Sequence, residues 1–231
     1  MQRYAVITKK LPREIVLLKG LPCVWGRCTF CDYITDNTTD EGIIQRVADE
    51  ELAKVTGEFG RLEVINSGSV QELPELVRVQ IRDLRRRLHI EDFICESYWS
   101  YRKTFDETRS FFGPGTRIKL GVETFDDHVR NEVLNKAMHF DSPEDVARLT
   151  DTICLMVGIR GQTRDVIRRD VDILLRHFRY GCVNLFMPNS KSAGLLDEDL
   201  KDWFREEFAW LDEHPTIEVL WRNTDFGVGE L

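Results

Sequence analysis

The rest of the chain is organised around one stretch, Pro22-Cys23-Val24-Trp25-Gly26-Arg27-Cys28-Thr29-Phe30-Cys31-Asp32-Tyr33. It follows the apolar residues 15–18, a run typical of a strand buried in a parallel sheet, and it precedes a polar, turn-rich segment. Its three cysteines have the spacing C-x4-C-x2-C. Gly26, Arg27 and Thr29 suit an exposed loop, so we expect three thiols on a loop at the end of a strand.

Three thiolates on one short loop predict a [4Fe–4S] cluster with an open iron. Cys23, Cys28 and Cys31 would bind three irons and leave the fourth for a small molecule, whereas electron-transfer clusters use four cysteines. A zinc site is the alternative, because Asp32 could act as a fourth ligand, although no further Cys or His lies close in sequence. The other cysteines, Cys95, Cys154 and Cys182, lie in or beside apolar strands and are expected to be core thiols.

Downstream, apolar strand-like runs alternate with amphipathic helices about six times, a pattern typical of parallel strands with helical crossovers. We therefore expect an α/β fold, a partial (β/α)6 TIM-like barrel with an open parallel sheet and helices outside. A doubly wound sheet is the alternative. Either fold places the site at the carboxyl ends of the strands. The chain is expected to be one domain, 1–231, with its core at about 13–190 and a C-terminal extension over 191–231.

The sequence also predicts where some helices and irregular segments begin and end. Residues 1–12 are expected to be an irregular lead-in. A capping-box pattern at Thr38 and Glu41 predicts a helix through about Phe59, and a second helix is expected over residues 126–137.

Composition excludes several classes of protein. The chain has 231 residues, 42% of them hydrophobic, and a formal charge of −8. That charge argues against nucleic acid as the substrate, because binding to phosphates needs a basic surface. No run of 18 apolar residues and no secretory segment occurs, so we expect a cytoplasmic protein without a membrane partner.

The cysteine loop resembles the cluster motif of the radical S-adenosylmethionine (SAM) superfamily, including the aromatic Phe30 before the last cysteine. The first spacing is four residues here and usually three there. The resemblance implies a [4Fe–4S] cluster and SAM as cofactors, with Phe30 lying against the adenine. It also implies reductive cleavage of SAM to a 5′-deoxyadenosyl radical, and a low-potential donor such as flavodoxin or ferredoxin.

Further motifs in the same order extend the resemblance over roughly residues 13–190. The Asn66-Ser67-Gly68-Ser69 segment is similar to the motif that receives the methionyl amino group. By resemblance to oxygen-independent coproporphyrinogen oxidase and Elongator-like members, Glu123 would bond the ribose and Lys136 the methionyl carboxylate. An exposed helix lysine is the alternative for Lys136. The expected cofactor-binding residues are Phe30, Tyr33, Asn66, Ser67, Gly68, Ser69, Glu123, Lys136, Arg160 and Gly161, with Arg160 in place of the proline usual there.

Substrate groups are expected at the other strand ends. Glu96 beside Tyr98 and Trp99 would suit a polar, flat base, although a packed surface loop would show the same residues. Further candidates are Asp36, Asn189 and Arg222.

The N-terminal stretch from Lys10 through Tyr33 is similar to the queuine lyases of queuosine salvage. That family implies C–N bond cleavage of queuine to 7-aminomethyl-7-deazaguanine, so a deazaguanine base would be the small-molecule substrate. Two alternatives stay open: a transfer-RNA-modifying methylthiotransferase or Elongator-like radical enzyme, and a non-catalytic iron–sulfur or zinc-binding protein.

Overall fold

The computed structural model describes residues 1–222 and 225–229. Within them, eight strands form a sheet whose order follows the chain, from β1 to β8. A doubly wound sheet reverses its order at a switch point, so this sequential order excludes that alternative. The strands are β1 (Tyr4–Ile7), β2 (Arg13–Leu18), β3 (Arg61–Asn66), β4 (Asp92–Ser97), β5 (Thr116–Glu123), β6 (Thr152–Val157), β7 (Tyr180–Leu185) and β8 (Ile217–Leu220).

Helices alternate with these strands, which confirms the predicted α/β partial barrel. The neighbours β2–β3, β3–β4, β6–β7 and β7–β8 are parallel. The helices are α1 (Glu41–Leu52), α2 (Glu75–Arg87), α3 (Phe105–Phe112), α4 (Pro143–Ala147), α5 (Arg164–His177) and α6 (Glu198–Glu207).

Packing divides the chain into two compact units. The first contains Met1–Gly26, Tyr33–Lys119 and the described residues from Phe226 onward, and the second contains Arg27–Asp32 and Leu120–Asp225. The cysteine loop therefore contributes to both units, as does β5. The single domain expected from the sequence remains a prediction, and each unit is described on its own below.

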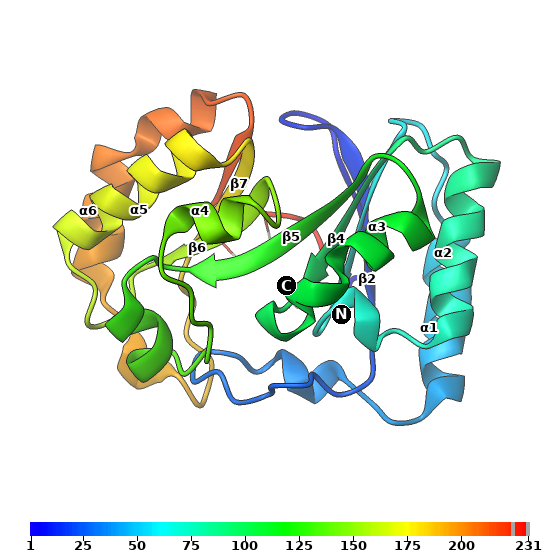
Figure 1. Cartoon of the computed structure of the whole chain (residues 1–231), viewed down its shortest axis with the longest axis horizontal. Helices are drawn as coiled ribbons and strands as arrows, with labels where there is room; N and C mark the ends of the chain where they lie inside the picture. Colours follow the sequence, from blue (N-terminus) through cyan, green and yellow to red (C-terminus); the bar gives the residue numbers. More distant parts are fainter. Residues whose placement is uncertain (223–224, 230–231) are drawn as a thin grey trace. The chain divides into compact units, whose positions relative to one another are not determined.

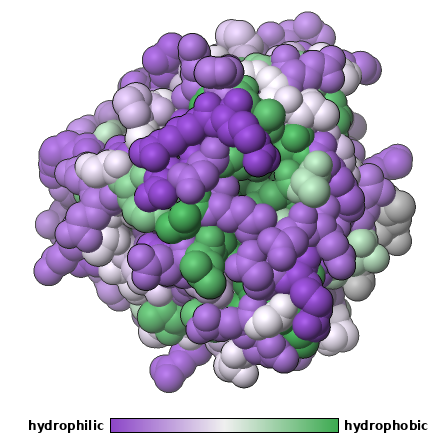
Figure 2. Space-filling model, turned by 90° about the vertical axis from the view of Figure 1, so that its right-hand side faces the viewer, coloured by the Kyte–Doolittle hydropathy of each residue, from purple (hydrophilic) through white to green (hydrophobic). Residues whose placement is uncertain are grey.

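In the first unit, β1 pairs antiparallel with β2, with Tyr4 opposite Val16. The expected irregular lead-in is therefore wrong, because the short apolar run of residues 4–7 pairs with the edge of β2. Helices α1 and α2 lie side by side along the sheet (Figure 1). Between helices and strands lies a core of fully buried residues: Val16, Leu18, Ile44, Ala48, Val64, Val77 and Ile81. Figure 2 shows the side of the molecule that carries α1 and α2, where the surface is mainly hydrophilic with small apolar patches.

In the second unit, β6, β7 and β8 align Leu155 with Val183 and Val183 with Val219. Helices α5 and α6 lie next to each other (Figure 1), and Arg168 Nε on α5 donates to Glu207 Oε1 on α6 at 3.2 Å. The apolar face of α5 buries Ile167, Val171 and Leu174. No helix in the described ranges 1–222 and 225–229 is long and apolar enough to cross a membrane.

Two predicted helices are shorter than expected. Helix α1 starts after Asp40, whose carboxylate accepts from the N–H of Ile43, and it ends at Leu52 rather than near Phe59. The predicted helix over 126–137 is reduced to one π-helical turn, Val129–Val133. Asn135 and Ala137 have positive φ angles of 50° and 46°, which an α-helix does not accommodate.

Candidate functional site

The three loop cysteines are half-buried and lie on a segment without regular strand or helix. Cys23 belongs to the first unit, and Cys28 and Cys31 belong to the second. In the part of the chain that the structure describes, no three His, Cys, Asp or Glu side chains gather closely enough to hold a metal ion. The three-cysteine cluster site therefore stays a prediction.

The remaining cysteines behave as predicted. Cys95, Cys154 and Cys182 are buried, and burial raises the pKa of the Cys95 thiol to about 12. A thiol that stays protonated is a poor metal ligand. The loop cysteines are therefore the thiols in the chain best suited to bind iron.

In the second unit, the loop is anchored around Phe30. The N–H of Thr29 donates to the Leu134 carbonyl at 3.1 Å, and Asn189 Nδ2 donates to the Phe30 carbonyl at 2.9 Å. The Phe30 ring packs against an apolar cluster made by Val129, Leu134, Met156, Ile159 and Phe186. Asn189, predicted as a substrate residue, thus holds the cysteine loop through its side-chain amide.

Glu123 and Lys136, predicted as cofactor residues, form a buried ion pair. Lys136 Nζ lies 2.7 Å from Glu123 Oε1, and the two side chains are 5% and 8% exposed. Lys136 Nζ also lies 5.4 Å from the centre of the Phe30 ring. The exposed helix lysine considered as the alternative is therefore wrong. Gly121 leaves room for the pair, because a Cβ there would lie 2.7 Å from Glu123 Oε1.

The electrostatics of the pair follow from its burial. Burial alone would lower the pKa of Lys136, but the Glu123 carboxylate and then the Cys28 thiol raise it above its usual value. Lys136 is therefore a fixed cation on the side of the loop that carries Cys28. Such a cation is suited to bind a carboxylate.

Two residues that the sequence did not reveal fix the backbone around this pair. Arg130 donates from Nε to the Met138 carbonyl at 2.8 Å and from Nη1 to the Thr124 carbonyl at 3.1 Å. Asp170 accepts from Thr124 Oγ1 at 2.5 Å and from the N–H of Phe125 at 3.0 Å. Burial raises the pKa of Asp170 to about 6, against the lowering effect of these two bonds. Asp170 lies on α5, far from Glu123 in sequence, so no local pattern could have identified it.

The loop after β6 has the tight geometry expected of a backbone binding motif. Gly161 has φ +102°, and Arg160 is exposed and donates its N–H to the Leu195 carbonyl at 2.6 Å. The buried Gln162 side chain accepts from the N–H groups of Gly158 and Ile159 and donates to the Met156 carbonyl. Gln162 thus holds this loop, a role that the sequence did not reveal.

In the first unit, the Asn66–Ser69 segment is a compact turn after β3. Asn66 Nδ2 donates to the Ser69 carbonyl at 2.9 Å, and Asn37 Nδ2 donates to the Ser67 carbonyl at 2.8 Å. Asn66 Oδ1 is buried without a hydrogen-bond partner. Gly68 is required, because a Cβ there would overlap Glu72 Oε2. An acceptor without a donor at this turn fits the amino group that the resemblance places here.

Asp36 is bound on several sides within the first unit. Arg3 Nη2 and Lys19 Nζ each lie 2.6 Å from Asp36 Oδ1, and Ser67 Oγ donates to Oδ2 at 3.2 Å. Burial would raise the pKa of Asp36, but the bonds from Arg3 and Lys19 lower it. Tyr33, at the start of the same turn, is 62% exposed. Asp36 is therefore a well-bound carboxylate that ties this turn to the Asn66–Ser69 segment.

Glu96 belongs to a charged network on the sheet of the first unit. Glu96 Oε1 lies 3.5 Å from Lys119 Nζ, Lys119 also contacts Glu63, and Arg13 Nε lies 2.6 Å from Glu63 Oε2. Burial would raise the pKa of Glu63, but Lys119 and Arg13 lower it to about 2. Glu96 keeps 31% of its side chain exposed, so its carboxylate is both held and reachable.

The other substrate candidates differ in exposure. Tyr98 is half-buried and donates its N–H to Ser69 Oγ at 3.0 Å, which places it beside the candidate amino-group turn. Trp99 is only 7% exposed, and the Arg102 guanidinium lies 4.8 Å from the centre of its ring. Arg222, in the second unit, is exposed and donates its N–H to Asp225 Oδ2.

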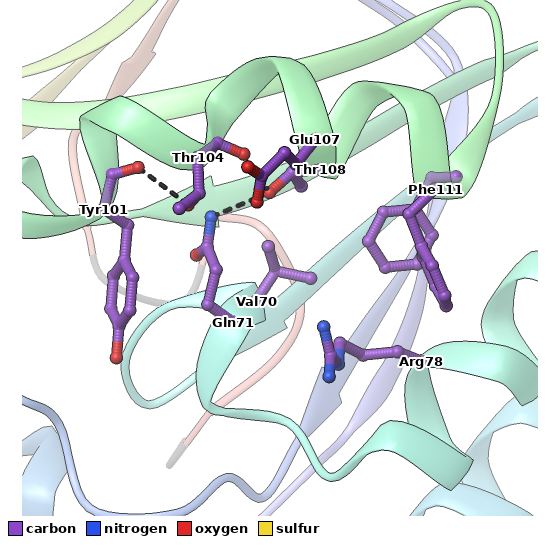
Figure 3. Close-up of a pocket in the computed structure, with 9 residues that line it drawn as sticks. Val70, Gln71, Arg78, Tyr101, Thr104, Glu107, Thr108 and Phe111 are labelled. Atoms are coloured by element: carbon purple, nitrogen blue, oxygen red, sulfur yellow. Dashed lines mark hydrogen bonds between the residues drawn. The ribbon is translucent and has the colours of Figure 1, made fainter.

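A pocket of about 380 Å³ lies within the first unit, between the Val70–Glu72 turn, α2 and α3. Figure 3 shows Tyr101 at one end of it and Arg78 with Phe111 at the other. Gln71 crosses its floor, donating to Thr108 Oγ1 at 3.1 Å. None of the residues predicted to bind cofactor or substrate lines this pocket.

The chain offers thiols, a cation and an acceptor as groups that could bind an iron–sulfur cluster and SAM. The three loop thiols are half-buried and lie on a segment without regular helix or strand. A buried cation, Lys136, and an unpaired acceptor, Asn66 Oδ1, lie on segments predicted to meet the methionyl group. The chemistry of these groups suits a cluster and SAM, and the site that they would form stays a prediction.

Searches against protein-family models and against curated proteins return no match. Among solved structures, queuine lyase from Clostridium spiroforme bound to SAM and queuine has 44% sequence identity and a TM-score of 0.97, covering 100% of both chains. SuiB from Streptococcus suis has a TM-score of 0.52 at 11% identity, covering 89% of this chain and 48% of that chain, which shows a likeness of fold. SuiB bound to S-adenosylmethionine gives the same TM-score, 0.52, at 10% identity. On the identity and full coverage of the first match, the chain belongs to the queuine lyase family of the radical SAM superfamily.

Proposed function

We propose that the chain is a queuine lyase that binds SAM and queuine and cleaves queuine to 7-aminomethyl-7-deazaguanine. The bond broken is the C–N bond between the cyclopentenediol and the aminomethyl nitrogen. The observation that carries the proposal is 44% identity over the whole length to a queuine lyase bound to SAM and queuine. The match covers every segment that holds a candidate site residue.

Cys23, Cys28 and Cys31 would hold the [4Fe–4S] cluster in this proposal. When bound with SAM, the cluster supplies the electron for SAM cleavage and thereby the 5′-deoxyadenosyl radical that abstracts hydrogen from queuine. The half-burial of the three thiols supports this role, since such cysteines can reach a cluster while the loop still limits access of water.

The residues of the second unit would bind most of SAM. Phe30, on its apolar cluster, offers a flat wall for the adenine. Lys136 would neutralise the methionyl carboxylate, and Glu123 would accept hydrogen bonds from the ribose hydroxyls. The ion pair between Lys136 and Glu123 would hold both side chains in place. The backbone of Arg160 and Gly161, held by Gln162, would read the adenine edge.

The remaining cofactor contacts would come from the first unit. The Asn66–Ser69 turn would receive the methionyl amino group, and the unpaired Asn66 Oδ1 supplies an acceptor on that turn. Tyr33, exposed at the end of the cysteine loop, would contribute a contact beside the cluster.

Glu96 would be the principal substrate residue. Its carboxylate, held by Lys119, would accept from the guanine-like N–H edge of queuine or from the secondary ammonium. Tyr98 lies close to the same turn, and Trp99, Asp36, Asn189 and Arg222 complete the proposed substrate set, with Asp36 and Asn189 acting through the loops they hold. A flavodoxin or ferredoxin would supply electrons, and the cytoplasm is the expected compartment.

The proposal is tested by anaerobic incubation of the reconstituted chain with SAM, dithionite and queuine, read by mass spectrometry. We expect 7-aminomethyl-7-deazaguanine together with 5′-deoxyadenosine, and neither product from the Cys31→Ala variant. The Cys95→Ala variant is the matched control, because that thiol is buried and remote in sequence from the loop. Formation of 5′-deoxyadenosine without the aminomethyl base would refute the lyase assignment and leave a radical SAM enzyme with another substrate.

A further inference from the structure

We propose that Glu72 is a positioning residue that holds the Cys23 end of the cysteine loop in the conformation that receives the cluster. This inference rests on the proposed function, because it assigns a residue to the cluster site of the same enzyme. Glu72 is not a ligand in this proposal. It acts through the backbone on either side of Cys23.

The contacts of Glu72 lie on both sides of Cys23 within the first unit. Its backbone carbonyl accepts from the N–H of Leu21 at 3.0 Å, and its Oε1 accepts from the N–H of Val24 at 2.6 Å. Two N–H groups that flank Cys23 are therefore bound by one residue. Because Glu72 is only 5% exposed, these bonds are shielded from competing water.

The second carboxylate oxygen binds the Asn66–Ser69 segment. Glu72 Oε2 accepts from the N–H of Ser69 at 2.6 Å, and Gly68 provides the space, since a Cβ there would overlap that oxygen. One buried carboxylate thus joins the cysteine loop to the turn predicted to receive the methionyl amino group. A Cys23 ligand and that turn would be held together by the same side chain.

The chemistry requires a carboxylate at this position. Both oxygens must accept, one from Val24 and one from Ser69, and a carboxylate is acceptor-only. Tyr101 adds a third donor, with its hydroxyl 3.4 Å from Oε1. Burial and the adjacent Glu72 raise the pKa of Tyr101 to about 12, so the phenol remains a donor. A glutamine would place an N–H against one of these donors and lose that bond.

The test compares the anaerobically reconstituted wild-type chain with Glu72→Gln, and Glu75→Gln is the matched control. Glu75 is exposed at the start of α2, so its substitution removes the same charge three residues away. The readout is the rate of iron loss to a chelator without SAM. We expect Glu72→Gln to lose iron about tenfold faster than wild type, the effect of one lost bond to a charged acceptor, and Glu75→Gln to match wild type. Equal iron retention by Glu72→Gln and wild type overturns the inference.

If Glu72→Gln does not fold, a second measurement tests whether Glu72 holds the cysteine loop. Hydrogen exchange of the cluster-loaded wild-type chain should show the Val24 amide protected, because the Glu72 bond persists when the cluster is bound. Exchange of Val24 at the rate of a free peptide overturns the inference. A wild-type chain that binds no iron refutes the proposed function itself, so the two failures give different results.

Discussion

Asp170→Asn should remove a pH dependence of stability that is built into the second unit. Asp170 is 3% exposed, and burial raises the pKa of its carboxyl from the ordinary 3.8 to about 6. A folded-state pKa above the unfolded value means that the carboxyl stabilises the fold fully below pH 3.8 and loses that contribution as the pH rises through about 6. Ionised Asp170 therefore destabilises the protein at neutral pH.

The size of the effect follows from the two pKa values. A difference of about 2 pH units at 1.36 kcal/mol each corresponds to about 3 kcal/mol. Asparagine retains both contacts of the neutral acid, because Oδ1 can accept from the N–H of Phe125 and Nδ2 can donate to Thr124 Oγ1. The free energy of unfolding of Asp170→Asn, relative to that of wild type, should therefore rise by up to about 3 kcal/mol between pH 4 and pH 7.

Urea unfolding of the apo chain at intervals of pH between 4 and 7.5 measures this difference. Asp165→Asn on the same helix is the control, because Asp165 is 93% exposed and should not change the pH dependence. Parallel stability curves for wild type and Asp170→Asn would refute the reasoning. A loss of stability in Asp170→Asn at neutral pH would refute it as well.

Three further predictions follow from the site. Substituting any loop cysteine (Cys23, Cys28 or Cys31) by Ala should abolish uptake of about four irons per chain on reconstitution, measured by iron analysis, while Cys95→Ala should retain it. Lys136→Met should lower the free energy of unfolding by about 3–5 kcal/mol, because it leaves the Glu123 carboxylate buried and unpaired, and adding Glu123→Gln should recover most of that loss in urea unfolding. Glu96→Gln should raise KM for queuine about tenfold in steady-state assays with little change in SAM affinity, since one charged acceptor facing the base is lost.

The strands and their polar ends could be predicted because local patterns encode them. Parallel strands show as short apolar runs, and the predicted run before the cysteine loop is β2. The edge strand β1 was missed because its four residues gain their structure by antiparallel pairing with β2 rather than from their own pattern. Helix ends were misplaced where a side chain such as Asp40 caps the helix at a different residue.

The site residues that were missed act through side-chain bonds to the backbone of loops. Gln162 and Arg130 bind backbone groups of nearby residues, and these bonds leave no periodic pattern in the sequence. Asp170 binds the N–H of Phe125 from another element, and such a residue has no local signature in sequence. Glu72 has no local signature in the sequence either. Its pairing with Val24 joins residues 48 positions apart. The resemblance supplied Glu123 and Lys136 separately, but their ion pair emerges only in the fold.

Glu123 shows why these supporting contacts matter for function. It is a non-glycine residue with φ +68°, a conformation that costs of order 1 kcal/mol and persists only when its surroundings enforce it. Lys136 holds its side chain, while Asp170 and Arg130 both bind the adjacent Thr124. An extended backbone would avoid the strain but turn the carboxylate away from Lys136. The fold therefore maintains a strained residue that keeps one carboxylate and one ammonium group side by side, as the proposed binding of ribose hydroxyls by Glu123 and of a carboxylate by Lys136 requires.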